Sequence, residues 1–231
     1  MSAEANHKKI IVVLPAYNEG PVVRQVIISL LKIVSTVIVV DDGSAVPMIR
    51  QLHDLPLVLL RHRVNLGQGA ALQTGLMYAK KLNPDIVITF DADGQHNEED
   101  IKSLIAPIVA NEADIVLGSR FLPESETIVP LTKRIILQFA RIINFLLSGI
   151  LLTDAHNGLR ALNKTALTKI NLTENRMAHA SEFLFEIKKH KLRCKEIPVH
   201  IRYTDYSMQK GQKGRDSIKV LFDLLLHKLF K

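Results

Sequence analysis

Apolar residues in the first half of the chain alternate between short continuous runs and longer stretches of helical period. Continuous runs rich in Val and Ile predict strands that are buried on both faces. Stretches with apolar residues three or four positions apart predict helices between them. The expected strands are residues 10–14, 36–40, 55–60, 85–90 and 114–117, and the expected helices are residues 22–33, 69–80 and 98–109. This alternation predicts an α/β fold with a mostly parallel sheet, right-handed crossovers and helices on both faces.

The second half contains two amphipathic segments. Residues 132–147 form an apolar pattern with a narrow polar stripe, and residues 217–231 repeat it with polar residues at every fourth position. Arg141 lies in the middle of the longer apolar stretch, where a charge costs about 3 kcal/mol or more in a bilayer, which argues against a membrane-spanning helix. Both segments fit an interfacial helix with peripheral membrane contact, or packing on the protein's own core or on a second subunit in a homodimer.

Composition narrows the class of protein. The chain has 231 residues, 47% of them hydrophobic, and a single cysteine, which excludes an internal disulfide framework and a Cys-rich zinc site. The formal net charge of +7 lies in residues 186–231, since the first 185 residues are balanced. This basic segment favours an anionic membrane surface or a polyanionic ligand, and no recognition motif indicates nucleic acid. Residues 1–9 carry no apolar signal-peptide core, so we expect a cytoplasmic location, peripheral on the cytoplasmic face of a membrane.

The candidate chemistry begins with a pair of carboxylates that follows a buried strand. Asp91 and Asp93 come directly after the run at 85–90, and Gln95 follows them. Ligands of open α/β sheets bind at the carboxyl ends of strands. Oxygen ligands of this kind suit Mn²⁺ or Mg²⁺, which binds one or two carboxylates together with substrate phosphates. The alternative is a polar loop with capping acids, because an Asp-x-Asp pair is short and occurs often by chance.

Other predicted strands also end in polar loops. Residues 15–19 follow the first strand, residues 41–44 the second and residues 65–69 the third, while Arg120 follows the strand at 114–117. Each loop alone is compatible with an ordinary turn or helix cap. The glycine-rich loop at 65–69 matches neither the dinucleotide fingerprint nor the Walker loop. Together the loops provide what a nucleotide diphosphate requires at one edge of a sheet.

In this order, five of these segments resemble a family 2 glycosyltransferase of the GT-A fold. The segments are VLPAYNE (13–19), VVDDGS (39–44), NLGQGAA (65–71), DADGQH (91–96) and GSRF (118–121). Within that family the chain resembles the dolichyl-phosphate mannose synthase-like, or polyprenyl-phosphate glycosyltransferase, group over about residues 8–205. The resemblance implies a nucleotide-sugar donor, with GDP- and UDP-sugars both open, and a divalent cation. It implies a polyprenyl-phosphate or glycan acceptor.

The resemblance also implies site residues. Nucleotide-sugar contacts are expected from Pro15, Tyr17, Glu19, Val40, Asp42, Asp91, Ala92, Asp93 and Arg120. The metal ligands are expected to be Asp91, Asp93 and Gln95. A basic loop at 203–213 looks like one that closes over donor phosphates, with Arg202, Lys210 and Lys213 neutralising the leaving diphosphate. The segment 154–160 (DAHNGLR) sits where the relatives carry Asp-x-x-Ser-Gly-Phe-Arg, and it departs at His156, Asn157 and Leu159.

The reaction expected from this resemblance is an inverting, metal-dependent sugar transfer. A lipid phosphate is already anionic and needs no protein base, whereas a sugar hydroxyl needs a carboxylate to take its proton. Glu182 is the first candidate base, at the start of a predicted helix, and Asp154 is the second. For Glu182 the alternative is an acid that interacts with the helix dipole.

Two other functions remain open from the residues. A nucleotidyltransferase also uses carboxylate-bound Mg²⁺ on an α/β sheet, but residues 15–19 are not its glycine-rich triphosphate loop. A non-catalytic nucleotide-sugar-binding module would have lost part of the Asp91, Asp93 and Gln95 set. We expect one glycosyltransferase domain at 1–215, with a nucleotide-binding half at 1–120 and an acceptor half at 121–215, followed by an amphipathic helix at 216–231.

Overall fold

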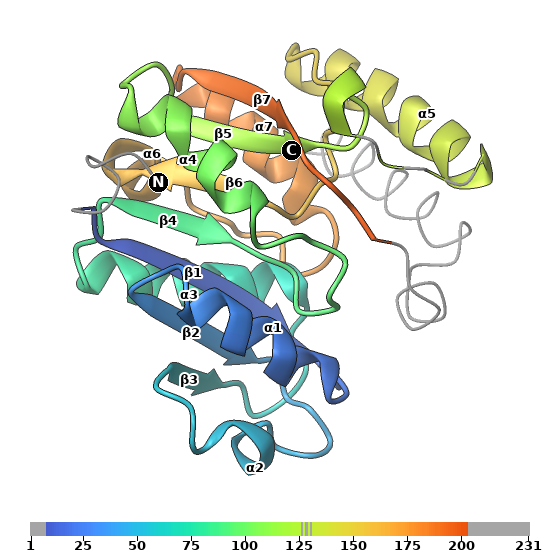
Figure 1. Ribbon diagram of the computed structural model, residues 1–231. Coiled ribbons are helices and arrows are strands. Elements are labelled where there is room, and N and C mark those ends of the chain that lie inside the picture. Colours follow the sequence, from blue (N-terminus) through green and yellow to red (C-terminus); the bar gives the residue numbers. More distant parts are fainter. Residues whose placement is uncertain (1–7, 126, 128, 130, 203–231) are drawn as a thin grey trace.

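A seven-stranded sheet forms the centre of the protein, as seen in a computed structural model that describes residues 8–202 except 126, 128 and 130 (Figure 1). The strand order is β3-β2-β1-β4-β6-β5-β7, and only β6 runs antiparallel to its neighbours. The strands are β1 (Ile10–Ala16), β2 (Thr36–Asp41), β3 (Val58–Arg61), β4 (Ile86–Thr89), β5 (Ile115–Ser119), β6 (Arg160–Asn163) and β7 (Cys194–Pro198). The mostly parallel α/β sheet expected from the sequence is therefore confirmed.

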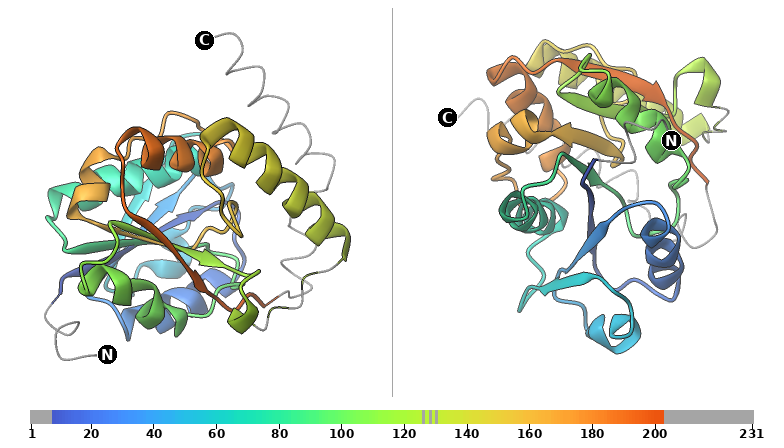
Figure 2. Two further views of the ribbon diagram at one scale, coloured as in Figure 1. Left: turned by 90° about the horizontal axis from the view of Figure 1, so that it is seen from above. Right: turned by 60° about the vertical axis from the view of Figure 1, so that its left-hand side comes forward.

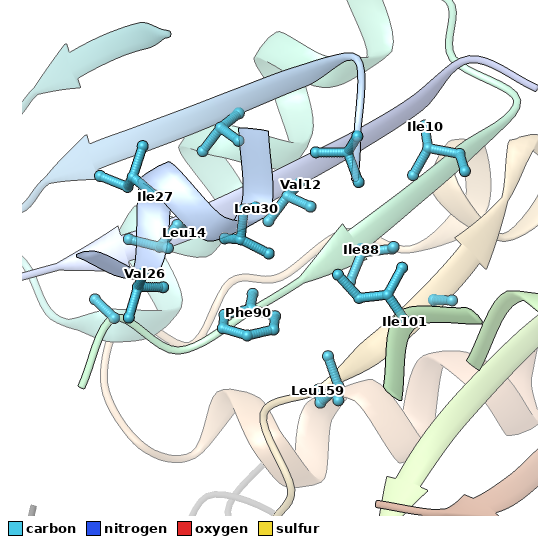
Figure 3. Packing of buried hydrophobic residues seen from close by; sticks show 14 of the residues in the cluster. Ile10, Val12, Leu14, Val26, Ile27, Leu30, Ile88, Phe90, Ile101 and Leu159 are labelled. Carbon is cyan, nitrogen blue, oxygen red and sulfur yellow. The ribbon is translucent and has the colours of Figure 1, made fainter. Parts of the chain in front are cut away.

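Helices cover both faces of this sheet (Figure 2). They are α1 (Val22–Leu31), α2 (Ile49–Leu52), α3 (Gln68–Lys81), α4 (Asp100–Val109), α5 (Leu131–Ser148), α6 (Lys164–Lys169) and α7 (His179–Lys189), with a 3₁₀ turn at Pro123–Ser125. Side chains alternate along each strand, so Val12 and Leu14 pack with α1 and α4, while Ile11 and Val13 pack with α3, α6 and α7. Figure 3 shows the first of these two clusters, built around β1, α1 and β4.

Several elements differ from the sequence prediction, among them β3 and β6. The strand expected at 55–60 begins only at Val58, because Pro56 cannot donate a ladder hydrogen bond and residues 53–57 form turns. Strand β6 was not expected, since its four residues begin with a charged Arg160. It inserts between β4 and β5, so the two halves of the chain share one sheet. The helix expected at 216–231 lies outside the described residues.

Helix α5 presents its apolar side outward. Its buried residues are Ala140, Asn144 and Ser148, spaced by four along the side that packs toward α7. Its exposed large apolar residues follow a second stripe and are Leu131, Ile135, Phe139, Ile142, Phe145 and Leu146. Among the described residues, no helix is both long enough and apolar enough to cross a membrane. The amphipathic helix expected at 132–147 is thus confirmed, and its apolar face is not covered by the described part of the chain.

Candidate functional site

The polar loops after β1, β2, β4 and β5 meet at one edge of the sheet, because these strands are parallel (Figure 1). The first two loops are tied directly: the Asn18 amide donates to Ser44 Oγ at 2.9 Å, and Asn18 Oδ1 accepts from the Ala45 amide at 2.9 Å. Asn18 adopts a positive φ of 49°, a conformation that asparagine tolerates better than most residues. The sheet thus gathers the segments that the sequence places at successive strand ends.

Asp42 holds the glycine-rich loop against β2. Its carboxylate accepts hydrogen bonds from His62 Nδ1 at 2.7 Å, Asn65 Nδ2 at 2.8 Å and the amides of Leu66 and Gly67 at 3.0 and 2.7 Å. The His62 ring also bridges to Thr74 on α3 through Nε2, at 2.9 Å. Asp42 was expected to contact the nucleotide. In the structure its carboxylate orients the loop that starts α3, and His62 is a supporting residue that the motifs did not indicate.

Asp91 is part of the loop after β4 and lies next to the start of α3. Its carboxylate accepts from Gln68 Nε2, at the start of α3, at 3.0 Å and pairs with His96 Nε2 at 3.0 Å. Its side chain keeps 30% of its surface exposed. Burial opposes ionisation, but the His96 hydrogen bond and the charges of His96 and Arg160 outweigh it, so the pKa of Asp91 lies below its ordinary value. An ionised carboxylate at this edge is suited to a cation.

Asp93 lies close to this charge and turns toward Gln95. It accepts from the Gln95 amide at 3.1 Å and from the Gln95 side chain. Burial and the charge of Asp91 raise the pKa of Asp93. Two neighbouring carboxylates and an amide are oxygen donors of the type that Mn²⁺ and Mg²⁺ prefer, so the residues fit a divalent cation. Among the described residues, no group of three or more His, Cys, Asp and Glu side chains is arranged to hold a metal ion.

Gly158 lies directly against Asp91. A Cβ atom at this position would come within 2.2 Å of Asp91 Oδ2. The clash involves the movable end of a side chain, so we expect Gly158→Ala to fold and to displace the carboxylate. Displacement of a metal ligand by about 1 Å is expected to weaken Mn²⁺ binding by roughly tenfold to a hundredfold. Titration calorimetry with Mn²⁺ measures this change.

A matched variant separates packing from metal binding in that experiment. In Gly118→Ala the added Cβ would meet Val199 Cγ1 at 2.9 Å, and none of its three nearest atoms belongs to Asp91 or Asp93. We expect this variant to lower the melting temperature and to keep the Mn²⁺ affinity of the wild type. Equal affinity of the Gly158→Ala variant and the wild type would contradict the assignment of Asp91 as a metal ligand.

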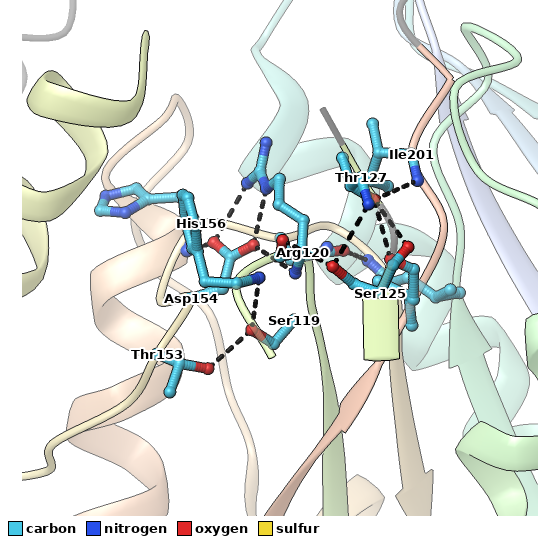
Figure 4. A network of polar contacts seen from close by, with 12 residues as sticks. Ser119, Arg120, Ser125, Thr127, Thr153, Asp154, His156 and Ile201 are labelled. Atoms are coloured by element: carbon cyan, nitrogen blue, oxygen red, sulfur yellow. Dashed lines mark hydrogen bonds and ion pairs between the residues drawn. The ribbon is translucent and has the colours of Figure 1, made fainter. Parts of the chain in front are cut away.

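Arg120, after β5, is fixed by a buried ion pair with Asp154 (Figure 4). Asp154 accepts from Arg120 Nε at 2.6 Å, from Nη2 at 3.1 Å and from the Arg120 amide at 3.2 Å. Burial raises the pKa of Asp154, but the charge and hydrogen bonds of Arg120 outweigh it and the pKa lies below its ordinary value. Asp154, expected as the second candidate base, is therefore an ionised partner that orients a guanidinium.

A second buried arginine lies beneath the same edge. Arg160, at the start of β6, stacks on the ring of Phe183 at 4.5 Å, and its Nη1 atom has no hydrogen-bond partner. Burial lowers the pKa of Arg160 to about 10, so it stays charged at neutral pH. Burial also lowers the pKa of His156 and of His179 to about 4, so both rings are neutral there. The guanidinium of Arg160 is thus a fixed positive charge near Asp91, whereas the rings of His156 and His179 are neutral.

The other residues expected around the nucleotide divide into two groups. The side chains of Pro15, Val40 and Ala92 are buried in the core, so only their backbone atoms could contact a ligand. Tyr17 is exposed, and Glu19 is half-buried in the first loop. The Arg202 amide donates to the Gln95 carbonyl at 2.8 Å, which brings this expected cation next to the carboxylate loop. Lys210 and Lys213 lie outside the described residues.

Glu182, expected as the first candidate base, is engaged elsewhere. Its carboxylate accepts from the amide and hydroxyl of Thr173, at 2.6–3.0 Å, and from the Glu174 amide at 2.9 Å. These contacts clamp the loop before α7, and within the described residues none of its hydrogen bonds goes to a strand-end loop. The helix-start position was correct. The sequence could not reveal that the side chain turns toward residues 173–174.

Comparisons with known proteins identify the family. The model of the family described as glycosyl transferase family 2 matches residues 11–171. A Methanococcus voltae protein named UDP-N-acetylglucosamine--dolichyl-phosphate N-acetylglucosaminyltransferase is 35% identical over 97% of this chain and 98% of its own. An undecaprenyl-phosphate mannosyltransferase of Micrococcus luteus is 27% identical over 71% of this chain and 70% of its own.

A solved structure agrees in fold. Glucosyl-3-phosphoglycerate synthase from Mycobacterium tuberculosis, in complex with Mn²⁺, uridine diphosphate and phosphoglyceric acid, superposes with a TM-score of 0.70 at 20% identity. The superposition covers 96% of this chain and 80% of the other. The match of the family model over most of the chain, with this fold, shows that the protein belongs to glycosyl transferase family 2 and is a glycosyltransferase of the GT-A fold, grouped with relatives named for polyprenyl-phosphate acceptors.

Proposed function

We propose that the protein transfers a sugar from a nucleotide-sugar to a polyprenyl phosphate, with inversion at the anomeric carbon and with Mn²⁺ or Mg²⁺ bound. The observation that carries this proposal is the gathering of three charged groups at one edge of the sheet: the Asp91 and Asp93 carboxylates after β4, and Arg120 after β5, whose guanidinium is fixed by Asp154. The names of the relatives supply the acceptor class. UDP-N-acetylglucosamine is the first donor to test, and GDP- and UDP-hexoses follow it.

In this proposal each charged group has a defined task. Asp91 and Asp93, with the side-chain amide oxygen of Gln95, would hold the divalent cation that binds the donor diphosphate. When bound, the cation neutralises the diphosphate and makes it a better leaving group. Arg120 is oriented by Asp154 through Nε and Nη2, and its guanidinium presents positive charge to a phosphate. Arg202 and Lys210 add positive charge where the diphosphate leaves. Tyr17, Glu19 and the backbone of Pro15, Val40 and Ala92 line the nucleotide, with Asp42 shaping the adjoining loop.

A phosphate acceptor requires no protein base, because its oxygen is already anionic near neutral pH. This agrees with the geometry of both candidate bases. The Glu182 carboxylate binds residues 173–174, and the Asp154 carboxylate binds Arg120. A glycan acceptor would instead need one of them to take a proton.

The test is transfer of radiolabelled sugar to dolichyl or undecaprenyl phosphate in detergent, with and without Mn²⁺. We expect a lipid-linked product that depends on both the metal and the lipid phosphate. Formation of a nucleotide-sugar from a sugar 1-phosphate and a nucleoside triphosphate would indicate a nucleotidyltransferase instead. Binding of UDP with Mn²⁺, seen as a raised melting temperature, without turnover of any donor would indicate a binding module.

The variant Glu182→Gln separates the two acceptor classes. We expect kcat with polyprenyl phosphate to stay within about twofold of the wild type, because the glutamine oxygen still accepts from the loop amides and no proton is abstracted. Initial rates at saturating donor measure this. A general base contributes about 10²–10⁴-fold, so a loss of that size would restore Glu182 as the base and favour a hydroxyl acceptor.

We propose that α5 contacts the membrane surface from the cytoplasmic side. Its exposed stripe carries Phe139, 61% exposed, and Ile135, 62% exposed, with Arg134 beside them. An apolar face with a basic edge suits the interface of an anionic bilayer, where a polyprenyl phosphate is located. The basic charge of residues 186–231 acts in the same direction.

Flotation with phosphatidylglycerol vesicles tests this contact. We expect the wild type to float and Phe139→Glu to remain at the bottom, because a buried charge in the acyl region costs about as much as a few apolar contacts contribute. Met77→Glu is the matched control, since Met77 is also exposed and lies on α3. A wild type that does not float but elutes as a dimer, with Phe139→Glu monomeric, would assign the stripe to a homodimer.

A further inference from the structure

Glu196, in the edge strand β7, anchors the loop that carries Asp154. Its Oε1 atom accepts from the Thr153 amide at 2.9 Å, the Thr153 hydroxyl at 2.8 Å and the Asp154 amide at 2.9 Å, and Oε2 accepts from the Thr153 amide at 2.8 Å. Glu196 pairs in parallel register with Leu117 of β5, two residues before Ser119. A carboxylate of the sheet therefore binds the backbone of a loop that connects α5 to β6.

From Thr153 and Asp154 the hydrogen bonds continue to Ser119 and Arg120 (Figure 4). Thr153 Oγ1 also shares a 2.6 Å hydrogen bond with Ser119 Oγ, so the loop is fastened to β5 as well as to β7. The next residue, Asp154, takes three hydrogen bonds from Arg120. The orientation of the guanidinium thus depends on Asp154, and the position of Asp154 depends on Glu196.

Such an arrangement has a physical reason. A buried ion pair is favourable only when its geometry is good and its remaining hydrogen bonds are satisfied. Asp154 lies on a loop, where the backbone is more mobile than in a strand. Because the Asp154 amide is hydrogen-bonded to the Glu196 carboxylate of β7, the Arg120–Asp154 ion pair is fixed to the rigid sheet. Supporting hydrogen bonds of this kind hold ligand-binding residues in place in accurately arranged sites.

We propose that Glu196 is a positioning residue of the transferase, which acts through Thr153 and Asp154 to orient Arg120 toward a substrate phosphate. This rests on the proposed function, in which Arg120 binds a phosphate. Glu196 itself touches no substrate. Its side chain transmits the rigidity of β7 to the guanidinium.

The experiment is a double-mutant cycle of Glu196→Ala and Arg120→Lys, measured as kcat/KM with polyprenyl phosphate. Lysine keeps the positive charge but lacks the planar guanidinium. In that background the orientation that Glu196 supports should therefore no longer affect phosphate binding. We expect Glu196→Ala alone to lower kcat/KM by roughly tenfold to a hundredfold. In the Arg120→Lys background the same substitution should change kcat/KM by less than about twofold.

Two further measurements distinguish positioning from loss of structure. The Mn²⁺ affinity of Glu196→Ala should equal that of the wild type, because in the described part of the chain no hydrogen bond joins Asp91 or Asp93 to Glu196, Thr153 or Asp154. Glu196→Gln keeps an acceptor oxygen and should recover most of the activity. If the alanine variant loses its cooperative thermal transition, Thr153→Ala replaces it in the cycle, because it removes only the hydroxyl that binds Glu196 and Ser119. Lys195→Ala is the matched control, since Lys195 is on the same strand and pairs with the exposed Glu112.

An equal loss for Glu196→Ala in both backgrounds, or a weakened Mn²⁺ affinity, would overturn the positioning role. Activity of Arg120→Lys at the wild-type level would instead remove Arg120 from the proposed function. Absence of transfer by the wild type would overturn both proposals.

Discussion

Asp91→Asn is expected to lower kcat/KM for sugar transfer by roughly 10²–10³-fold, the loss typical when one group that stabilises developing charge is removed. Asparagine keeps the shape of the side chain and can still bind Gln68 and His96 by rotation of its amide. It removes the negative charge that the environment maintains, since the pKa of Asp91 is held below its ordinary value despite burial. The folded structure should persist, because the carboxylate is an acceptor at the edge of the sheet and not part of the core.

Two measurements check this expectation together. The transfer rate as a function of Mn²⁺ concentration should show a raised requirement for the metal, with the melting temperature in the absence of metal little changed. Asp114→Asn is the matched control, because Asp114 is also a paired carboxylate, bound to Arg193 near the start of β5 and far from the loop edge along the strand. It should lower stability and leave the metal dependence unchanged. An Asp91→Asn variant with the metal dependence of the wild type would contradict the assignment of the site.

The elements that the sequence predicts well are those whose signal is local. The first five strands and the helices α1, α3, α4 and α5 follow from continuous apolar runs and from helical periodicity, with ends displaced by a few residues. The carboxylate pair is predictable for the same reason, since a motif directly after a buried strand must lie at the edge of the sheet. Insertion of β6 between β4 and β5 is not predictable in this way, because pairing of Thr89 with Arg160 joins residues far apart in sequence.

The partners of site residues are less predictable than the residues themselves. Asp42, Asp154 and Glu182 each stand where the motifs place an acid, yet each carboxylate is directed by donors from a distant loop. His62 and Glu196 carry no motif at all, and only the fold shows that they bind Asp42 and the Asp154 loop. A sequence motif thus indicates which groups are near a site, whereas the hydrogen-bond donors around each group decide what it does there.

The Arg120 and Asp154 pair gives the second large effect, on stability as well as activity. Asp154→Ala removes the carboxylate that pairs with the guanidinium of Arg120, a buried group of which only 9% of the side chain is exposed. Breaking a buried pair in this way costs about 3–5 kcal/mol, so we expect a melting temperature lowered by roughly 5–20 °C for a domain of this size. Circular dichroism during heating measures the shift, and transfer activity should fall with it.

A double substitution then separates the structural from the functional part of this loss. Replacing both charges, as in Arg120→Met with Asp154→Leu, removes the uncompensated charge and fills the space with apolar atoms, which often restores or exceeds the original stability. We expect the double variant to melt near the wild type and to remain without transfer activity, because no guanidinium is left to bind phosphate. Recovery of activity together with stability would mean that the pair serves only the fold, and that a different cation binds the phosphate.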